Sequence, residues 1–116
     1  MNTFEIGRFQ LKTQYRDVSS DRGPAIHLYG PTPNGTMEIL RFDCFETEPH
    51  YHLAFAYKDQ PFIRIESPAP FAWAREKLQK DAVALLAASD ALPMDASERA
   101  ILDSILDDLL PPEAPG

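Results

Sequence analysis

The spacing of apolar residues changes once along the chain, and this change limits the folds that the sequence can adopt. Up to Glu66, apolar and polar residues largely alternate, which is typical of half-buried β-strands. From Ser67 onward, apolar residues recur every three or four positions, which is typical of amphipathic helices. Strands followed by helices predict an α+β domain, with the helices packed on one face of an antiparallel sheet.

The first part predicts a meander of about five strands. They are expected within residues 3–15, 25–30, 36–45, 51–57 and 62–66. Gly7 and Arg8 interrupt the alternation of the first stretch, which predicts a bulge or bend there. If residues 46–49 form a four-residue hairpin loop, Asp43 pairs with His52 on the next strand.

The second part predicts two helices. The first is expected to start at Ser67-Pro68, and its buried stripe consists of Phe71, Ala74, Leu78, Ala82 and Leu85. The second is expected to start with a capping box of Asp95 and Glu98, and its stripe consists of Ile101, Leu102, Ile105, Leu106 and Leu109. A chain of 116 residues with 44% hydrophobic content suffices for one core. We therefore expect a single domain over residues 1–110 and a flexible tail over 111–116.

The net charge of −7 is concentrated near the carboxy terminus, where residues 90–116 hold seven acidic residues and one arginine. The rest of the chain is nearly neutral and has no basic stripe, so we do not expect nucleic-acid binding. The acidic second helix is expected to be a hydrated surface, with docking of a basic protein as the alternative. The sequence has neither a long apolar run nor a secretory signal, and so predicts a cytoplasmic protein without a membrane partner.

Residues 41–52, RFDCFETEPHYH, contain the single cysteine and two of the three histidines. Strand phase directs Cys44 into the apolar core, where a thiol acts as a small hydrophobe. The same phase places Asp43, His50 and His52 on the opposite face, with the two histidines roughly 7 Å apart. Two imidazoles and one carboxylate suit zinc or iron(II), which makes this set a candidate metal site. The simpler alternative is a pair of unliganded surface histidines beside a turn.

Three further residues share the phase of this polar face. Arg41 and Arg64 are candidates to bind the carboxylate or phosphate of a small anionic ligand. The alternative is the ordinary hydrated side of a sheet. His27 is expected beside Ile39, roughly 13 Å from Asp43, which is too far to share an ion.

Two segments carry a resemblance to a known family. EILRFDCF at residues 38–45, followed by PHYH at residues 49–52, resembles a motif of small bacterial proteins grouped as an uncharacterised domain family. The resemblance covers roughly residues 20–80. It implies that the two segments belong together, and it implies no activity.

Two classes of function stay open. No complete catalytic constellation is present, so we favour a non-catalytic accessory or interaction protein of a bacterial cytoplasm. Its partners would be a second copy, through a sheet edge or the second helix, or a basic protein. The alternative is a metal- or small-anion-binding domain, catalytic or not, that acts through Asp43, His50 and His52 with Arg41 and Arg64 nearby.

Overall fold

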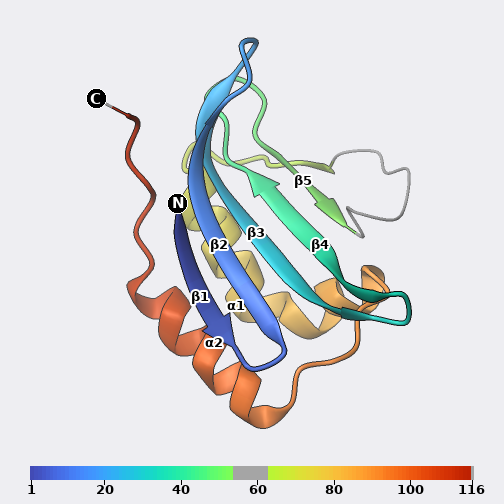
Figure 1. Cartoon of the computed structure of the whole chain (residues 1–116). Helices are drawn as coiled ribbons and strands as arrows, with labels where there is room; N and C mark the ends of the chain where they lie inside the picture. Colours follow the sequence, from blue (N-terminus) through green and yellow to red (C-terminus); the bar gives the residue numbers. More distant parts are fainter. Residues whose placement is uncertain (54–62, 116) are drawn as a thin grey trace.

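The computed structural model describes residues 1–53 and 63–115. In this part of the chain, six strands form one antiparallel sheet whose spatial order follows the sequence (Figure 1). The strands are β1 (Asn2–Ile6), β2 (Phe9–Asp17), β3 (Arg22–Thr32), β4 (Gly35–Asp43), β5 (His50–Leu53) and β6 (Ile63–Arg64). Two helices follow, α1 (Pro70–Ala88) and α2 (Ala96–Asp108). The predicted α+β fold with a meander sheet is confirmed.

The strand beyond the expected five comes from the first alternating stretch, because the predicted bend is a hairpin turn. Gly7 has a φ of +56°, a left-handed conformation that glycine adopts without a steric penalty, and it turns the chain from β1 into β2. Phe4 then pairs with Leu11, and Ile6 with Phe9. Of the strand predicted over 51–57, residues 54–57 lie outside the described part, as does Phe62.

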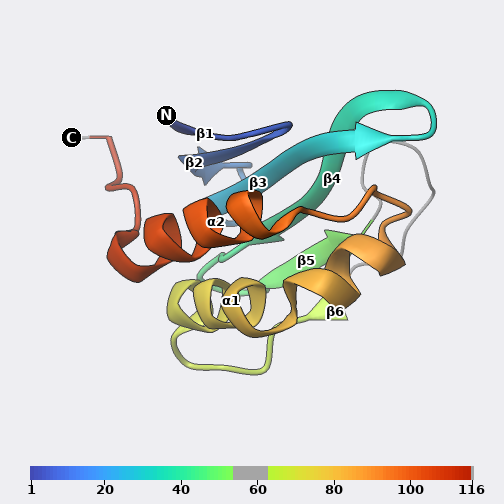
Figure 2. The same ribbon diagram turned by 90° about the horizontal axis from the view of Figure 1, so that it is seen from below.

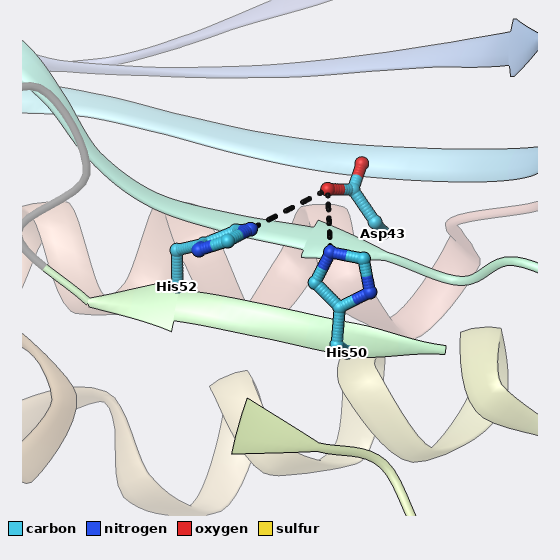
Figure 3. Close-up of side chains that lie close together, drawn as sticks. All are labelled: Asp43, His50 and His52. Atoms are coloured by element: carbon cyan, nitrogen blue, oxygen red, sulfur yellow. Dashed lines mark ion pairs between the residues drawn. The ribbon is translucent and has the colours of Figure 1, made fainter. Parts of the chain in front are cut away.

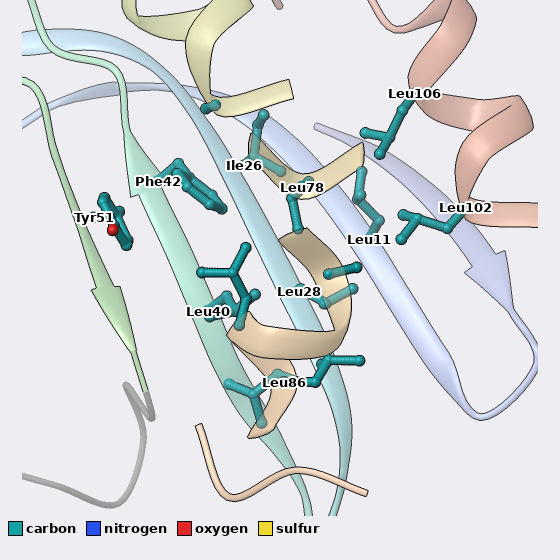
Figure 4. Close-up of a cluster of buried hydrophobic side chains, with 14 of the residues drawn as sticks. Leu11, Ile26, Leu28, Leu40, Phe42, Tyr51, Leu78, Leu86, Leu102 and Leu106 are labelled. Carbon is teal, nitrogen blue, oxygen red and sulfur yellow. The ribbon is translucent and has the colours of Figure 1, made fainter. Parts of the chain in front are cut away.

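Both helices cover the same side of the sheet (Figure 2). Between them and the sheet lies one apolar core, which includes Leu11, Ile26, Leu28, Leu40, Phe42, Leu78, Leu102 and Leu106 (Figure 4). Four of the five stripe residues predicted for α1 are buried, and Phe71 packs against the core from its margin. In α2 the prediction is wrong for Ile101, whose exposed fraction is 38%. No helix in the described ranges is long and apolar enough to span a membrane.

The start of α1 differs from the prediction. The helix begins at Pro70 rather than at Ser67-Pro68. Ser67 Oγ accepts a hydrogen bond from the backbone N–H of Ala69 in the preceding turn, at 3.1 Å. Proline in the first helical turn is well tolerated because its missing N–H has no partner there.

The start of α2 is fastened to the β1–β2 turn. The predicted capping box is confirmed: Asp95 accepts from Glu98 N at 2.8 Å, and Glu98 Oε1 accepts from Asp95 N at 2.9 Å. The buried Glu98 carboxylate also accepts from Arg8 N at 2.8 Å and from Arg8 Nη2 at 2.7 Å. A Cβ atom at Gly7 would lie only 2.6 Å from Glu98 Oε2. We refer to these contacts as the Arg8–Glu98 clamp.

Candidate metal-binding site

The register between β4 and β5 brings the polar residues of both strands together. Asp43 pairs directly with His50, and Arg41 with His52. The predicted pairing of Asp43 with His52 is therefore wrong by two residues, although an even shift leaves every side chain on its predicted face. The connection is longer than the four residues assumed, because the backbone after Asp43 continues to bond to β3. Cys44 N donates to Pro24 O at 2.9 Å.

The β4–β5 connection is held by the carboxylate of Asp21, the residue that directly precedes β3. Asp21 accepts hydrogen bonds from Thr47 N at 3.1 Å and from Glu48 N at 2.8 Å. Burial favours the neutral form of Asp21, but the backbone N–H donors outweigh it and lower its pKa. At Gly23 a Cβ atom would lie 2.4 Å from Cys44 O, so only glycine allows this close approach. No sequence pattern indicates these roles of Asp21 and Gly23.

Asp43, His50 and His52 converge on the side of the sheet away from the helices (Figure 3). Asp43 Oδ2 lies 3.4 Å from His50 Nε2 and 3.9 Å from His52 Nε2. One donor atom from each of the three residues lies within 4.8 Å of the others. The two imidazoles meet edge to face, with ring centroids 4.9 Å apart. These are the three residues predicted as metal ligands, and the structure brings them together.

Two arginines contact the Asp43 carboxylate, whose side chain is 1% exposed. Arg16 Nη1 donates to Oδ1 at 2.7 Å, and Arg41 Nε lies 3.2 Å from Oδ2. Burial would raise the pKa of Asp43, but the hydrogen bond from His50 and the charges of both arginines lower it to about 2. Asp43 is therefore an anion at neutral pH.

The two histidines differ in their surroundings. His50 Nδ1 lies 2.7 Å from Glu48 O, and since a carbonyl oxygen only accepts, Nδ1 carries the hydrogen of this bond. His50 Nε2 is thereby the nitrogen that faces Asp43. The hydrogen bond with Asp43 raises the pKa of His50. Burial and the neighbouring charges of His50 and Arg41 lower the pKa of His52, which favours its neutral form.

Arg16 reaches the site from β2, across the whole width of β3. The β3 residue opposite Arg16 is Gly23, and the β3 residue opposite Asp43 is Ala25. Because neither has a long side chain, the guanidinium can pass over β3 to the carboxylate. Arg16 was not predicted as a site residue. The two small residues Gly23 and Ala25 are the feature of the sequence that could have indicated this contact. They indicate it only once the register of β2, β3 and β4 is known.

His27 lies on the same polar face but belongs to a separate group. It pairs with Arg41 instead of lying beside Ile39 as predicted. Its Nδ1 lies 2.7 Å from Glu38 Oε2, and its Nε2 lies 2.9 Å from Gln14 Nε2. Both ring nitrogens of this buried histidine thus have protein partners.

Arg64 and Cys44 flank the three candidate ligands. Arg64 pairs with His50 on the neighbouring strand, and its Nη2 lies 3.6 Å from Glu48 Oε1. It also lines an open hollow of about 650 Å³ between the β4–β5 connection and the start of α1. Cys44 is buried, as predicted, and burial raises the pKa of its thiol to about 12. A thiol in this state is a poor metal ligand.

A known protein family matches nearly the whole chain. A family model described as "Domain of unknown function (DUF7700)" matches residues 3–109, from the first strand through the second helix. No curated protein and no solved structure matches the chain. The match includes all three candidate ligands.

Proposed function

We propose a metal-binding role for this chain, which belongs to the family described as a domain of unknown function (DUF7700). The ligands are Asp43, His50 and His52, and the ion is a divalent transition metal, zinc or iron(II). The family description names no activity, so the support for this proposal comes from the chemistry and geometry of the three side chains.

The observation that carries the proposal is the convergence of three donor atoms of suitable type. Two ligands that each lie about 2.1 Å from one ion can be at most about 4.2 Å apart. The distances from Asp43 Oδ2 to the two Nε2 atoms, 3.4 and 3.9 Å, satisfy this limit. The donor atoms all lie within 4.8 Å of one another, so the widest pair needs to close by at most about 0.6 Å to meet the same limit.

Protonation and outer hydrogen bonds also support this role. Asp43 is anionic, and the lowered pKa of His52 favours the neutral imidazole that binds metals. His50 donates its Nδ1–H to Glu48 O, an arrangement that is typical of histidines that ligate a metal through Nε2. The proton that Asp43 favours on His50 Nε2 occupies the direction of the metal, so an ion would replace it.

Elemental analysis of untagged protein purified without chelator tests the proposal. We expect near-stoichiometric zinc or iron in the wild type and none in His50→Ala/His52→Ala. His27→Gln is the matched control, since it changes the third histidine, which lies outside the ligand set, and should retain the metal. Absence of metal from the folded wild type, including after reconstitution with zinc(II) and anaerobic iron(II), would overturn the proposal.

A second candidate function is the interaction role that the sequence analysis favoured. Its support is that Ile101 and Leu110, with exposed fractions of 38% and 76%, accompany the exposed acids Asp107 and Asp108. Exposed apolar and acidic side chains on one helix and the residues that follow it suit a partner with basic and apolar side chains. Polylysine as a basic probe tests this role: the wild type should bind it at low salt, and the binding should weaken as the salt concentration rises and in Asp107→Lys/Asp108→Lys. A wild type that does not bind the probe at low salt would overturn this candidate.

A further inference from the structure

The Asp43 carboxylate is engaged unequally at its two oxygens. Arg16 Nη1 donates to Oδ1 at 2.7 Å. Both histidine Nε2 atoms are within 3.9 Å of Oδ2. Arg41 Nε also lies 3.2 Å from Oδ2, so each oxygen has one arginine beside it, and only Oδ2 has the two imidazoles as well. A metal ion held between the histidines would therefore bind Oδ2, while the Arg16 guanidinium occupies Oδ1.

Packing fixes Arg16 in this position. Its side chain is only 24% exposed, and its guanidinium carbon lies 5.8 Å from the centroid of the Phe45 ring. Phe45 in turn packs edge to face with His50, with centroids 5.6 Å apart. Phe45 thus packs against both Arg16 and His50, which contact Oδ1 and Oδ2 of Asp43 respectively.

Resting on the proposed metal site, we infer that Arg16 is a positioning residue that keeps Asp43 a one-oxygen ligand, and that the ion consequently binds a small anion at an open position. Three single-atom donors leave at least one position open on an ion that takes four or five ligands. Two neutral imidazoles and one carboxylate leave a divalent ion with a charge of +1. That residual charge favours an anionic ligand, such as a small carboxylate, over a neutral one.

Cobalt(II) with azide as the anionic probe tests this inference. We expect wild-type protein loaded with cobalt(II) to show the intense visible absorption of a four- or five-coordinate ion, and azide to shift it. In Arg16→Met, Oδ1 is released and can take the open position, so both the absorption and its response to azide should weaken. Arg16→Lys keeps a donor for Oδ1 and should behave like the wild type.

Arg22→Met is the matched control, because this exposed arginine pairs with Asp17, 3.7 Å away, and not with Asp43. Its cobalt spectrum and azide response should not change. If Arg16→Met does not fold, as judged by circular dichroism, Phe45→Leu takes its place. Loss of the ring beside Arg16 should change the spectrum in the same direction.

The outcomes separate this inference from the proposed function. If the folded wild type does not bind stoichiometric cobalt, zinc or iron, the metal site itself is overturned. If cobalt binds but azide does not change its spectrum, the inference of an open coordination position is overturned. If azide shifts the wild-type spectrum and the Arg16→Met or Phe45→Leu spectrum equally, the role of Arg16 is overturned.

Discussion

Asp43 and His50 occupy directly paired positions on β4 and β5, and Asp43 Oδ2 lies 3.4 Å from His50 Nε2. Because the other nitrogen of His50 donates to Glu48 O, the nitrogen that faces the carboxylate is the one that can bind either a proton or a metal ion. Protons and a metal ion therefore compete for His50 Nε2, and this competition can be measured.

Metal binding near pH 6.5 should release protons, and His50 should be their main source. Asp43 raises the pKa of His50, so this imidazole is mostly protonated there, whereas His52, with its lowered pKa, is mostly neutral. Release should decline as the pH rises through the raised pKa of His50. Calorimetry of zinc binding in buffers of different ionisation enthalpy measures the number. Equal release by the wild type and His50→Ala would contradict this assignment.

Asp43→Asn should destabilise the protein and make its free energy of unfolding depend less on pH in the acid range. The pKa of Asp43 falls from 3.8 to about 2 on folding, which corresponds to about 2 kcal/mol of stability. Since the pKa is depressed, this stability is fully present above the unfolded value and is lost as the pH falls from about 4 to about 2. Urea unfolding of metal-free protein between these limits tests it. Asp17→Asn is the control and should keep the wild-type slope, because this exposed carboxylate pairs with Arg22 and is not a partner of Asp43.

Glu98→Gln should lower the free energy of unfolding by about 1–2 kcal/mol at neutral pH, because it weakens both the helix cap and the charge-assisted bonds from Arg8. Thermal and urea unfolding measure the change. The exposed Glu113 in the tail provides the matched variant Glu113→Gln, whose stability should equal that of the wild type. A wild-type melting temperature for Glu98→Gln would show that the clamp contributes nothing.

Cys44 should resist alkylation in the folded protein. At the same pH, a thiol with a pKa of about 12 instead of 9 is about a thousandfold less ionised, and burial adds a barrier to access. Mass spectrometry after treatment with iodoacetamide, with and without denaturant, measures the difference. Modification at the same rate in both conditions would be inconsistent with the buried position.

Side-chain phase could be predicted from the sequence better than register. Alternation over residues 36–45 and 51–53 correctly places Cys44 in the core and Asp43, His50 and His52 together on the other face. The pairing partner of Asp43 was wrong because it depended on an assumed loop length. That length is determined by Asp21 and by backbone bonds to β3, and no local pattern near residues 44–49 indicates either.

Contacts between segments that are distant in sequence could not be predicted either, because local patterns do not indicate distant partners. Arg16 meets Asp43 only because two small residues of β3 lie between their strands. The capping box of Asp95 and Glu98 was predictable because its residues are three positions apart. The bonds from Arg8 to the same glutamate join residues 90 positions apart, and a periodicity argument cannot find such a pair.

The Arg8–Glu98 clamp has a consequence for the order in which the chain can assemble. Every neighbouring pair of strands in the described sheet is consecutive in sequence, so each hairpin can close soon after it leaves the ribosome. The first hairpin, however, is completed by a glutamate synthesised 90 residues later. Until α2 has been synthesised, the amide and the guanidinium of Arg8 can bond only to water. The β1–β2 hairpin, although it is made first, therefore gains the stabilisation from Glu98 last.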